Sequence, residues 1–538
     1  MIVYRSPLPD IYVPKANCVA HYFESPHLAQ FPNTVVMLDS YTGEQLTASE
    51  LHTAARRYMA LLARRYRVVK GDVVSIFTSN SIYLQPVHFG IVGLGGIICP
   101  ANANYTVSEL AYQLKMTSTK LIVCTVKNIS ITRRAIAEAG TKTRVLTLEQ
   151  AISDIKRLLA DESALEFDPV QLNDRIHPAY LCFSSGTTGL PKAVQITHRN
   201  LNAQIRQLAG TGGRLFQCRT RTVALLPFSH SYGLVSYLWA MPYLAQTMVV
   251  FDGFDFEHLL KSICEYDVGY FAAVPPMVLM LAKSPLVDKY PVGKHLKVVV
   301  SGAAPLAAST LKLCRERLPE VVFNQTYGLT EVSPYSHMVG YMSRHMYNNS
   351  IGWLIPNMRA RLVDPETLTD VPPGQPGELW LRGPNVMLGY YKNPEANNAA
   401  FHEGWLRTGD VARIDETGQY FIVDRLKELI KSKGHQVAPA ELEGILLTHE
   451  HVIEAAVIGV LDETETTENP RAFLVLRPEA DVEQILSWFN SLVSKHKRLW
   501  GGIVIVDQIP KSVSGKIIRR TLRARKNDTV YTPVDAKL

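Results

Sequence analysis

The sequence has no long, unbroken apolar run. The best candidate, Phe89 to Ala101, is short and is interrupted by Gly90, Gly93, Gly95 and Gly96. A helix that spans a bilayer needs about 20 consecutive apolar residues, so we expect no membrane span. The amino-terminus also lacks the basic-then-apolar pattern of a secretory signal.

Cysteine pairs and strongly basic tracts are missing as well. The seven cysteines are scattered, without the paired spacing of a zinc site or redox motif, which favours reduced, buried thiols in an intracellular protein. The net charge of +7 is modest for 538 residues and is not gathered in one segment. This balance argues against a nucleic-acid partner and suits a small polyanion such as ATP.

Apolar strand-like runs alternate with helical patterns from about residue 50 to 300, without internal repeats or low-complexity blocks. This alternation predicts layered α/β structure with mostly parallel sheets. Between about 351 and 423 the strands become shorter and Pro and Gly more frequent, which predicts a small β-rich lobe. The clearest strand-like runs are Val73–Phe77, Leu121–Cys124, Thr222–Leu226 and Val298–Val300.

Charge density rises after Asp424-Arg425, and a smaller α+β unit follows. We therefore predict two domains: residues 1–424, with the nucleotide and acid sites, and a mobile domain of residues 425–538. In the second domain the pattern predicts helices from Pro439 and from Asp481 to Lys495. It also predicts strands at Ala455–Val460, Phe473–Leu476 and Ile503–Val506.

The most informative segment is Tyr180–Val194, in which two apolar runs flank hydroxyls, glycines and a lysine. Glycines let a backbone approach a ligand closely, and hydroxyl and N–H donors with a lysine suit phosphate oxygens. The spacing differs from a P-loop, and Ala193–Ile196 reads as a strand, so we expect a hairpin loop, with helix capping at Thr197 or Asn200. A glycine-rich surface turn is the alternative. The candidate phosphate ligands are Ser184, Ser185, Gly186, Thr187, Thr188, Gly189 and Lys192.

Three further segments carry chemistry. Gln325–Glu331 offers an aromatic ring for adenine, a hydroxyl for phosphate and a carboxylate for Mg²⁺. Thr408-Gly409-Asp410 ends in a carboxylate that can accept hydrogen bonds from ribose hydroxyls. Asp424–Gly434 concentrates cations at the proposed boundary. Each alone could be an ordinary turn or a solvated charged face, but all occur in one chain beside the phosphate-like loop.

With these motifs in this order, and with Pro510–Lys516 near the end, the chain resembles the adenylate-forming enzymes from about residue 40 to 525. Among them it looks most like 4-coumarate–CoA ligases, through Arg425–Lys431 and Gln436–Glu443. The resemblance implies an AMP-forming acid–thiol ligase. A carboxylate attacks the α-phosphate of Mg-ATP to give an acyl-adenylate and pyrophosphate, and CoA then displaces AMP.

The resemblance also implies residue roles. Lys516 would bridge acid and phosphate, and rotation about Asp424-Arg425 would then withdraw it and present Lys433 and Gly434 for thiolation. Glu331 would hold Mg²⁺ and Thr330 the α-phosphate. The other implied nucleotide or CoA contacts are Gln325, Thr326, Tyr327, Gly328, Asp410, Arg425, Lys427 and Lys431.

On the acid side, the resemblance makes His230 a gate, although a core histidine is the alternative. It places Tyr232, Ala303, Ala304, Thr326 and Tyr335 around the substrate. Thr326 and Tyr335 are larger than the residues usual in coumarate ligases, which predicts a narrower or shorter tunnel. Ser432, His435 and Gly253 also depart from the family pattern, the last at a position where many relatives carry a lysine for CoA. Aryl, medium-chain fatty and pathway-specific acids of secondary metabolism all stay open.

Two rival activities share these motifs: loading of a carrier protein instead of CoA, and luciferase-like oxidation of the adenylate. A catalytically silent binding protein is disfavoured by the complete motif set. The chain ends in Ala536-Lys537-Leu538, which resembles a peroxisomal address. We therefore expect a peroxisomal enzyme that binds the import receptor through this tail.

Overall fold

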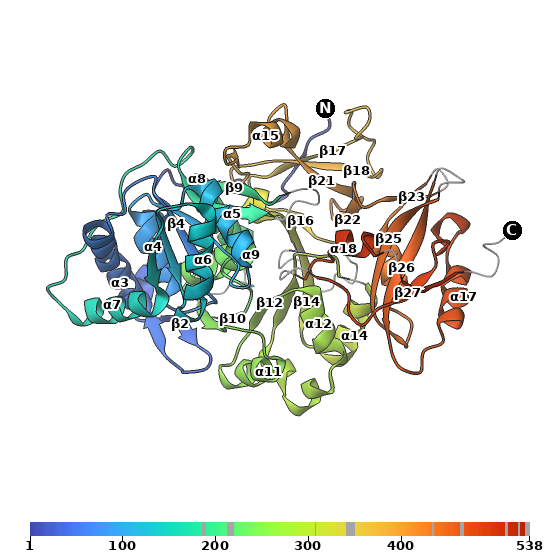
Figure 1. The fold of residues 1–538 in the computed structure, drawn as a ribbon, viewed down its shortest axis with the longest axis horizontal. Coiled ribbons are helices and arrows are strands. Elements are labelled where there is room, and N and C mark those ends of the chain that lie inside the picture. Colours follow the sequence, from blue (N-terminus) through green and yellow to red (C-terminus); the bar gives the residue numbers. More distant parts are fainter. Residues whose placement is uncertain are drawn as a thin grey trace.

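A computed structural model describes residues 1–184, 190–211, 220–306, 308–339, 350–432, 435–462, 467–511, 515–525 and 528–532. In Figure 1 the amino-terminal third lies on the left, a second sheet runs through the centre, a β-rich lobe lies above it and the carboxyl-terminal part lies on the right. This mixed α/β architecture confirms the predicted fold class.

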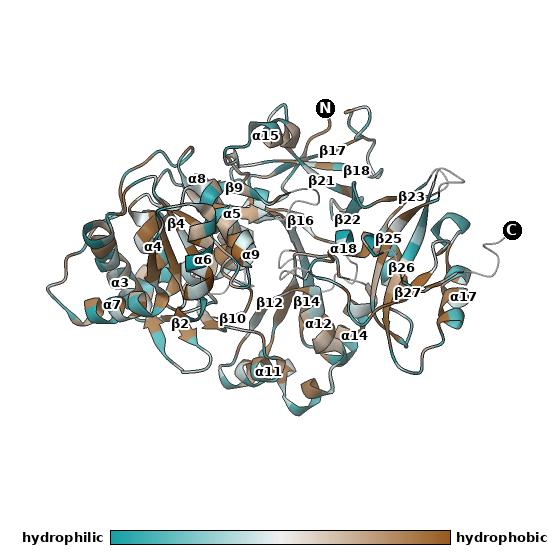
Figure 2. Cartoon of the chain, viewed as in Figure 1, coloured by the Kyte–Doolittle hydropathy of each residue, from teal (hydrophilic) through white to brown (hydrophobic). Residues whose placement is uncertain are grey.

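The first sheet has seven strands in the order β19-β9-β8-β5-β4-β6-β7. Its central strands run parallel, and β9 and β19 add an antiparallel edge. Strand β4 is buried at every position and apolar along most of its length (Figure 2), as expected of a parallel strand covered on both faces. The strands are β4 Val73–Phe77, β5 Ile97–Pro100, β6 Leu121–Cys124, β7 Arg144–Thr147, β8 Pro178–Ser184, β9 Lys192–Thr197 and β19 Gly389–Tyr390.

Helices connect these strands as the alternation predicted. Thr47 and Thr106 begin α3 and α5 with capping boxes closed by Glu50 and Glu109, which satisfy the first free backbone N–H groups. The helices of this region are α1 Cys18–Phe23, α2 Pro26–Gln30, α3 Ala48–Leu61, α4 Leu84–Gly93, α5 Val107–Thr117, α6 Ile129–Ala139, α7 Leu148–Ala160 and α8 His198–Thr211, with the short turns η1 Leu62–Tyr66 and η2 Val126–Asn128.

The second sheet has nine strands in the order β16-β15-β14-β13-β12-β10-β11-β2-β3. Its core from β14 to β2 is parallel, and antiparallel strands close both edges. Because parallel strands present their carboxyl ends at one edge, the segments after β13 and β14 emerge side by side. The strands are β2 Val35–Asp39, β3 Gln45–Thr47, β10 Arg221–Ala224, β11 Thr247–Val250, β12 Tyr270–Ala273, β13 Val298–Ser301, β14 Val322–Gly328, β15 Tyr335–Met338 and β16 Trp353–Leu354.

Short helices follow several of these strands. Phe228 and Trp239 are among the largest fully buried side chains of this region. The helices are α9 Ser231–Gly233, η3 Leu234–Ala240, α10 Met241–Tyr243, α11 Phe256–Glu265, α12 Pro275–Lys283, η4 Pro285–Lys289, α13 Val292–His295, α14 Ala308–Arg317 and η5 Thr330–Val332.

The lobe is a six-stranded antiparallel sheet in the order β1-β17-β18-β21-β20, with β22 paired to β21. The lobe extends beyond the predicted range of about 351 to 423. Tyr4–Arg5 joins its sheet as β1, and β22 continues to Arg425. Its elements are β1 Tyr4–Arg5, β17 Arg359–Val363, β18 Gly377–Arg382, α15 Pro394–Ala400, β20 Phe401–His402, β21 Trp405–Ile414 and β22 Tyr420–Arg425.

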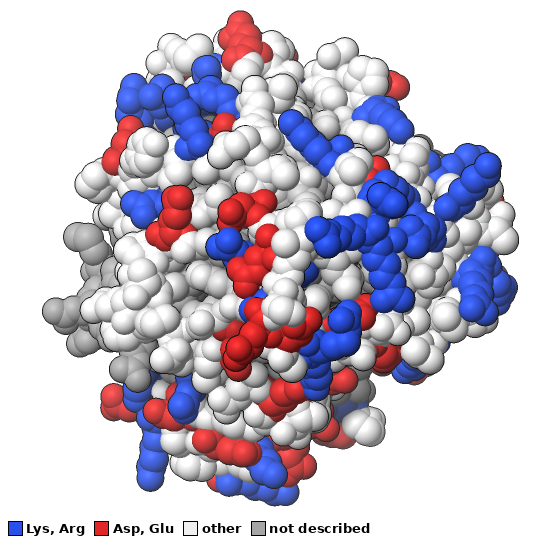
Figure 3. Space-filling view, turned by 90° about the vertical axis from the view of Figure 1, so that its left-hand side faces the viewer, with Lys and Arg blue, Asp and Glu red and all other residues white. Residues whose placement is uncertain are grey.

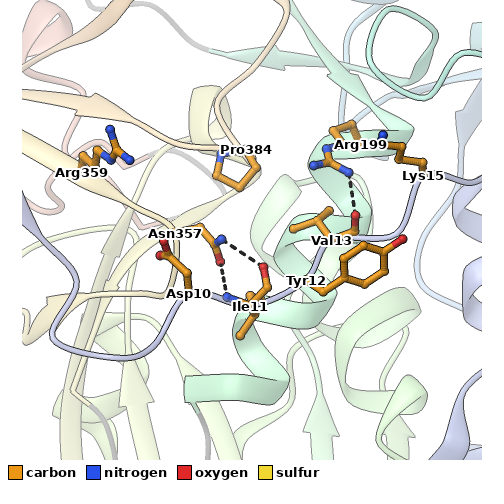
Figure 4. Close-up of a pocket in the computed structure, with 9 residues that line it drawn as sticks. All are labelled: Asp10, Ile11, Tyr12, Val13, Lys15, Arg199, Asn357, Arg359 and Pro384. Carbon is orange, nitrogen blue, oxygen red and sulfur yellow. Dashed lines mark hydrogen bonds between the residues drawn. The ribbon is translucent and has the colours of Figure 1, made fainter.

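The segment after β1 is held between the lobe and α8. Asn357 accepts a hydrogen bond from the backbone N–H of Ile11 (3.2 Å) and donates to its carbonyl (3.1 Å). Arg199 donates to the carbonyl of Val13 (2.7 Å) (Figure 4). A surface hollow of about 350 Å³ lies beside these contacts.

The carboxyl-terminal part contains a four-stranded sheet, β25-β26-β27-β28, and a separate hairpin of β23 and β24. The predicted helices and strands of this region are all present, with ends shifted by a few residues. Its elements are β23 Ile430–Ser432, β24 His435–Val437, α16 Pro439–Leu446, β25 Val452–Asp462, β26 Thr467–Leu476, α17 Val482–Leu492, η6 Lys495–Lys497, β27 Ile503–Ile505, α18 Arg519–Arg523 and β28 Val530–Tyr531.

The outer face of the amino-terminal part carries both signs of charge, with acidic side chains lying between basic ones (Figure 3). Arg56 pairs with Asp168 at 2.9 Å and Arg57 with Glu166 at 3.1 Å. Among the described residues, none forms a helix both long and apolar enough to cross a membrane.

Several buried or half-buried histidines have lowered pKa values. Burial lowers the pKa of His88, His198 and His337 to about 3, and that of His21 and His52 to about 4. In the unfolded chain these rings titrate near pH 6.5. As the pH falls below about 6.5, the unfolded state therefore binds protons that the folded state does not bind. The free energy of unfolding then decreases.

We predict that His88→Gln reduces this acid sensitivity. The ring of His88 contacts the Tyr180 hydroxyl at 3.1 Å, and glutamine keeps a hydrogen-bonding group there without titrating. Between pH 7.5 and 5.0 the variant should lose about 2 kcal/mol less free energy of unfolding than the wild type, measured by urea denaturation at both pH values. Parallel losses in the two proteins would contradict the prediction.

Candidate active site

The predicted phosphate segment is a hairpin between β8 and β9, in which Ser184 pairs with Lys192. This confirms the predicted hairpin and excludes the strand-to-helix geometry of a P-loop. Thr197 and Asn200 cap the following helix reciprocally, also as predicted. The residues at the tip, Ser185, Gly186, Thr187, Thr188 and Gly189, lie outside the described residues.

Strand β14 and the turn after it bring Gln325, Thr326, Tyr327, Thr330 and Glu331 to one sheet edge. Gln325 accepts a hydrogen bond from the backbone of Leu306 (3.0 Å), and Thr326 donates to the carbonyl of His337 (2.8 Å). Next comes Gly328, where a Cβ atom would lie 1.8 Å from the Pro334 carbonyl oxygen. Only glycine therefore allows β14 and the start of β15 to come this close.

Glu331 is nearly buried, with 9% of its surface exposed. Its Oε1 accepts a hydrogen bond from the Tyr390 hydroxyl (3.0 Å). The ammonium of Lys192 lies 5.0 Å from the centre of the same tyrosine ring. The carboxylate predicted to bind Mg²⁺ and the lysine predicted to bind phosphate therefore contact the same tyrosine. Thr330 lies beside them, with its hydroxyl 3.3 Å from that of Ser231.

Asp410 is held by two partners. Tyr327 donates its hydroxyl to Oδ2 (2.5 Å), and Nε of Arg425 lies 3.2 Å from Oδ1. Asp410 and Arg425 are also register partners in β21 and β22. Burial and the Asp410 carboxylate raise the pKa of Tyr327, so its hydroxyl stays a donor. The structure therefore brings Tyr327 to two residues that lie 83 and 98 positions later in the chain, Asp410 and Arg425.

Lys516 reaches this cluster from the carboxyl-terminal part. Burial and Arg425 lower the pKa of Lys516 to about 8, against the opposing pull of Asp410 and Glu331. Gly515 adopts a positive φ of 77°, and a Cβ there would touch Pro276 at 3.4 Å, so the loop lies against the start of α12. Burial and Lys516 in turn lower the pKa of His230 to about 4.

Two tyrosines lie near His230, whose Nδ1 accepts a hydrogen bond from the backbone N–H of Tyr232 (3.2 Å). Tyr232 donates its hydroxyl to the carbonyl of Val300 (3.3 Å), and its ring meets that of Tyr335 edge to face at 5.5 Å. The Tyr335 hydroxyl lies 2.6 Å from that of Ser236. Both rings are almost completely buried. Ala303 and Ala304 follow β13 at the same sheet edge, with Ala303 in the left-handed region (φ 71°).

Comparison with known proteins decides the family. Residues 25–391 match the family described as AMP-binding enzyme, and residues 441–516 match the AMP-binding enzyme C-terminal domain. The chain belongs to the AMP-binding enzyme family. It is 34% identical to 4-coumarate–CoA ligase 1 of Petroselinum crispum, and 32% identical to a probable 4-coumarate–CoA ligase 2 of Dictyostelium discoideum, over 97% of each chain.

Solved structures agree with this assignment. ATP-bound MatB from Rhodopseudomonas palustris superimposes with a TM-score of 0.85 at 26% identity, covering 95% of this chain and 98% of that one. The sequence-based identification of an adenylate-forming enzyme related to coumarate ligases is thereby confirmed.

The thiolation side of this AMP-binding enzyme is only partly described, because Lys433 and Gly434 lie outside the described residues. Beside them Ser432 is buried in β23, and His435 stacks on His496 at 4.2 Å. The backbone of Lys431 contacts Glu468 and Thr467 of β26, which places it with the carboxyl-terminal sheet. Lys427 follows Arg425 in the turn after β22.

The site of this AMP-binding enzyme also contains two residues that sequence reasoning missed, Tyr390 and Ser236. Neither tyrosine nor serine is charged, and neither of these two residues belongs to a recognisable sequence motif. Tyr390 lies in a two-residue strand far along the chain from Lys192. The pairing of β19 with β9 brings it to the site.

We predict that Tyr327→Phe weakens ATP binding about fivefold, because Asp410 loses a hydrogen bond worth about 1 kcal/mol. Tyr420→Phe is the matched control, since the buried Tyr420 hydroxyl has no hydrogen-bond partner in the described part of the chain. Both dissociation constants are measured by calorimetric titration. Equal effects of the two variants would contradict a specific role for Tyr327.

Proposed function

We propose that this AMP-binding enzyme, an ATP-dependent acid–CoA ligase that works through an acyl-adenylate, uses Lys516 to join a compact carboxylic acid to the α-phosphate of ATP. One observation carries the proposal. The loop of Lys516 lies against the start of α12, since a Cβ at Gly515 would touch Pro276. From there Lys516 interacts electrostatically with Asp410, Glu331 and His230. The relatives named as CoA ligases support CoA as the thiol that accepts the acyl group.

The first step joins two anions. A carboxylate oxygen of the acid attacks the α-phosphorus, the bond to the bridging oxygen breaks, and pyrophosphate leaves with the electron pair. The ammonium of Lys516 donates to the acid and to the α-phosphate, which offsets the negative charge that gathers in the transition state. Asp410 and Arg425 hold the ribose, and Tyr327 borders the adenine.

The β- and γ-phosphates would be held by Lys192 and by the hairpin residues from Ser184 to Gly189, and Thr330 would contact the α-phosphate. Glu331 suits Mg²⁺, because this ion commonly takes one or two carboxylates together with phosphate oxygens. Bound Mg²⁺ supplies positive charge to the phosphates. No group of three or more candidate metal ligands occurs among the described residues, which fits a metal that arrives with the nucleotide.

The second step needs room for CoA. The thiol sulfur attacks the acyl carbon, AMP leaves with its electron pair, and the thiol proton is released. Rotation about Asp424-Arg425 withdraws Lys516 and presents Lys433 and Gly434. The Asp424 carboxylate accepts hydrogen bonds from the backbone N–H groups of Arg425 (2.7 Å) and Ala440 (3.1 Å). These bonds would keep the pivot attached to the carboxyl-terminal part during the rotation.

The acid pocket supports a compact substrate. The edge-to-face rings of Tyr232 and Tyr335 lie near His230, where the resemblance implies the acid site, and the Tyr335 hydroxyl contacts that of Ser236. A short aryl or acyl acid fits such a pocket better than a long chain does. We also propose peroxisomal import through Ala536-Lys537-Leu538, a segment that lies outside the described residues.

Release of pyrophosphate from ATP, measured across a panel of carboxylic acids with and without CoA, tests the activity as a whole. We expect release that depends on the acid, and acyl-CoA only when CoA is added. If no acid prompts AMP formation, the proposed function is wrong.

We predict that Lys516→Ala lowers adenylate formation at least about a hundredfold, since it removes the charge nearest the transition state. Conversion of a supplied acyl-adenylate and CoA into acyl-CoA should change less than about twofold, because Lys516 is withdrawn in that step. Lys511→Ala is a matched control, since Lys511 pairs with Glu454 at 2.5 Å. An equal fall in both half-reactions would contradict the two-state account.

We predict that Tyr335→Val shifts the preference toward larger acids. Removing the ring opens space, so kcat/KM for 4-coumarate relative to benzoate should rise about tenfold or more. Tyr335→Phe removes only the contact with Ser236 and should shift the ratio less. Competition assays with both acids measure the change, and an unchanged ratio in Tyr335→Val would rule out this residue as a determinant of acid size.

A further inference from the structure

Tyr390 lies between two opposite charges of the candidate site. Its hydroxyl donates to Oε1 of Glu331 (3.0 Å), and the Lys192 ammonium lies 5.0 Å from the centre of its ring. One neutral side chain therefore engages both the proposed ligand of Mg²⁺ and the proposed ligand of phosphate.

The tyrosine is fixed by the backbone around it. Tyr390 pairs with Val194 of β9, two positions after Lys192. Asn397 of α15 accepts a hydrogen bond from the backbone N–H of Tyr390 (2.6 Å) and donates to its carbonyl (3.1 Å). The N–H of Met387 donates to the carbonyl of Glu331 (2.9 Å). The segment thus ties the phosphate hairpin, the Glu331 turn and the lobe into one unit.

A lysine and a glutamate that contact the same side chain attract each other, most strongly in a partly buried place. A direct pair would neutralise both charges and would have to break before ATP could bind. The Tyr390 ring offers Lys192 a face that attracts the cation without neutralising it. The hydroxyl occupies Oε1 of Glu331 and, within the described part of the chain, leaves Oε2 for another partner.

We propose that Tyr390 is a positioning residue, which keeps Lys192 and Glu331 apart and aimed at the phosphates and Mg²⁺ of incoming ATP. The inference rests on the proposed function of this site. It assigns the residue no contact with the reacting atoms. Its effect should appear in nucleotide binding and in the dependence on Mg²⁺, rather than in the handling of the acid or CoA.

Two substitutions separate the two contacts. Tyr390→Phe keeps the ring for Lys192 and removes the hydrogen bond to Glu331. It should raise the dissociation constant of ATP about tenfold when Mg²⁺ is present and leave binding of Mg²⁺-free ATP within about twofold of the wild type. Tyr390→Leu removes the ring as well, so that Lys192 and Glu331 can pair, and should weaken ATP binding with or without Mg²⁺.

Binding is measured by calorimetric titration of the whole protein with ATP in the absence of acid, with either Mg²⁺ or a chelator present. Tyr391→Phe is the matched control, because Tyr391 is the neighbouring tyrosine and its ring faces Lys392 at 4.9 Å. It should bind ATP like the wild type. The KM for the acid and the thiolation of a supplied acyl-adenylate should change less than about twofold in all three variants.

The proposal would be overturned if Tyr390→Phe bound ATP with wild-type affinity in the presence of Mg²⁺. It would also be overturned if ATP binding, the KM for the acid and thiolation were impaired equally, since that would point to a merely structural role. Should Tyr390→Leu fail to fold, Tyr390→Phe alone decides. If the wild type itself binds no ATP, the proposed function is wrong. If the wild type and the Tyr390 variants all bind ATP equally well, only the role of Tyr390 is wrong.

Discussion

The electrostatic interaction of one ammonium group, that of Lys516, with two carboxylates is the interaction on which the rest of the site depends. Removing a lysine from water is costly unless opposite charges compensate. Asp410 and Glu331 favour the charged form of Lys516, but burial and Arg425 outweigh them and lower its pKa to about 8. Each carboxylate is in turn held by a tyrosine, Tyr327 for Asp410 and Tyr390 for Glu331. Because tyrosine is neutral, it orients the carboxylate without adding a positive charge. Arg425, in contrast, also pairs with Asp410 and opposes the charge of Lys516.

This arrangement draws on every large part of the molecule. The first sheet supplies Lys192, the second sheet supplies Tyr327 and Glu331, the lobe supplies Asp410, and the carboxyl-terminal part supplies Lys516. None of these parts contains the site by itself. The lobe connects them, since β19 extends the first sheet and β22 leads into the carboxyl-terminal part. A swivel of that part would move Lys516 relative to the two carboxylates and so change the net charge of the site.

Much of the fold could be predicted from the sequence, because its strongest signals are local. The buried runs of β4 and β6 coincide with the predicted strands, and the turn residues between β8 and β9 indicated a hairpin. The charged site residues were recognisable through motifs. The supporting contacts were not, since Tyr390 meets Lys192, and Tyr335 meets Ser236, only after distant strands pair. The division into domains at residue 424 stays a prediction, and β22 crosses that point.

The two-residue strand β1 has a consequence for handling the protein. Tyr4–Arg5 pairs with Arg359 and Ala360 and so covers the outer edge of β17. An uncovered edge offers unpaired N–H and carbonyl groups to any other chain. Protein that lacks its first few residues would therefore expose an unpaired strand edge on the lobe. Self-association of this shortened protein would reflect the exposed edge rather than a natural oligomer.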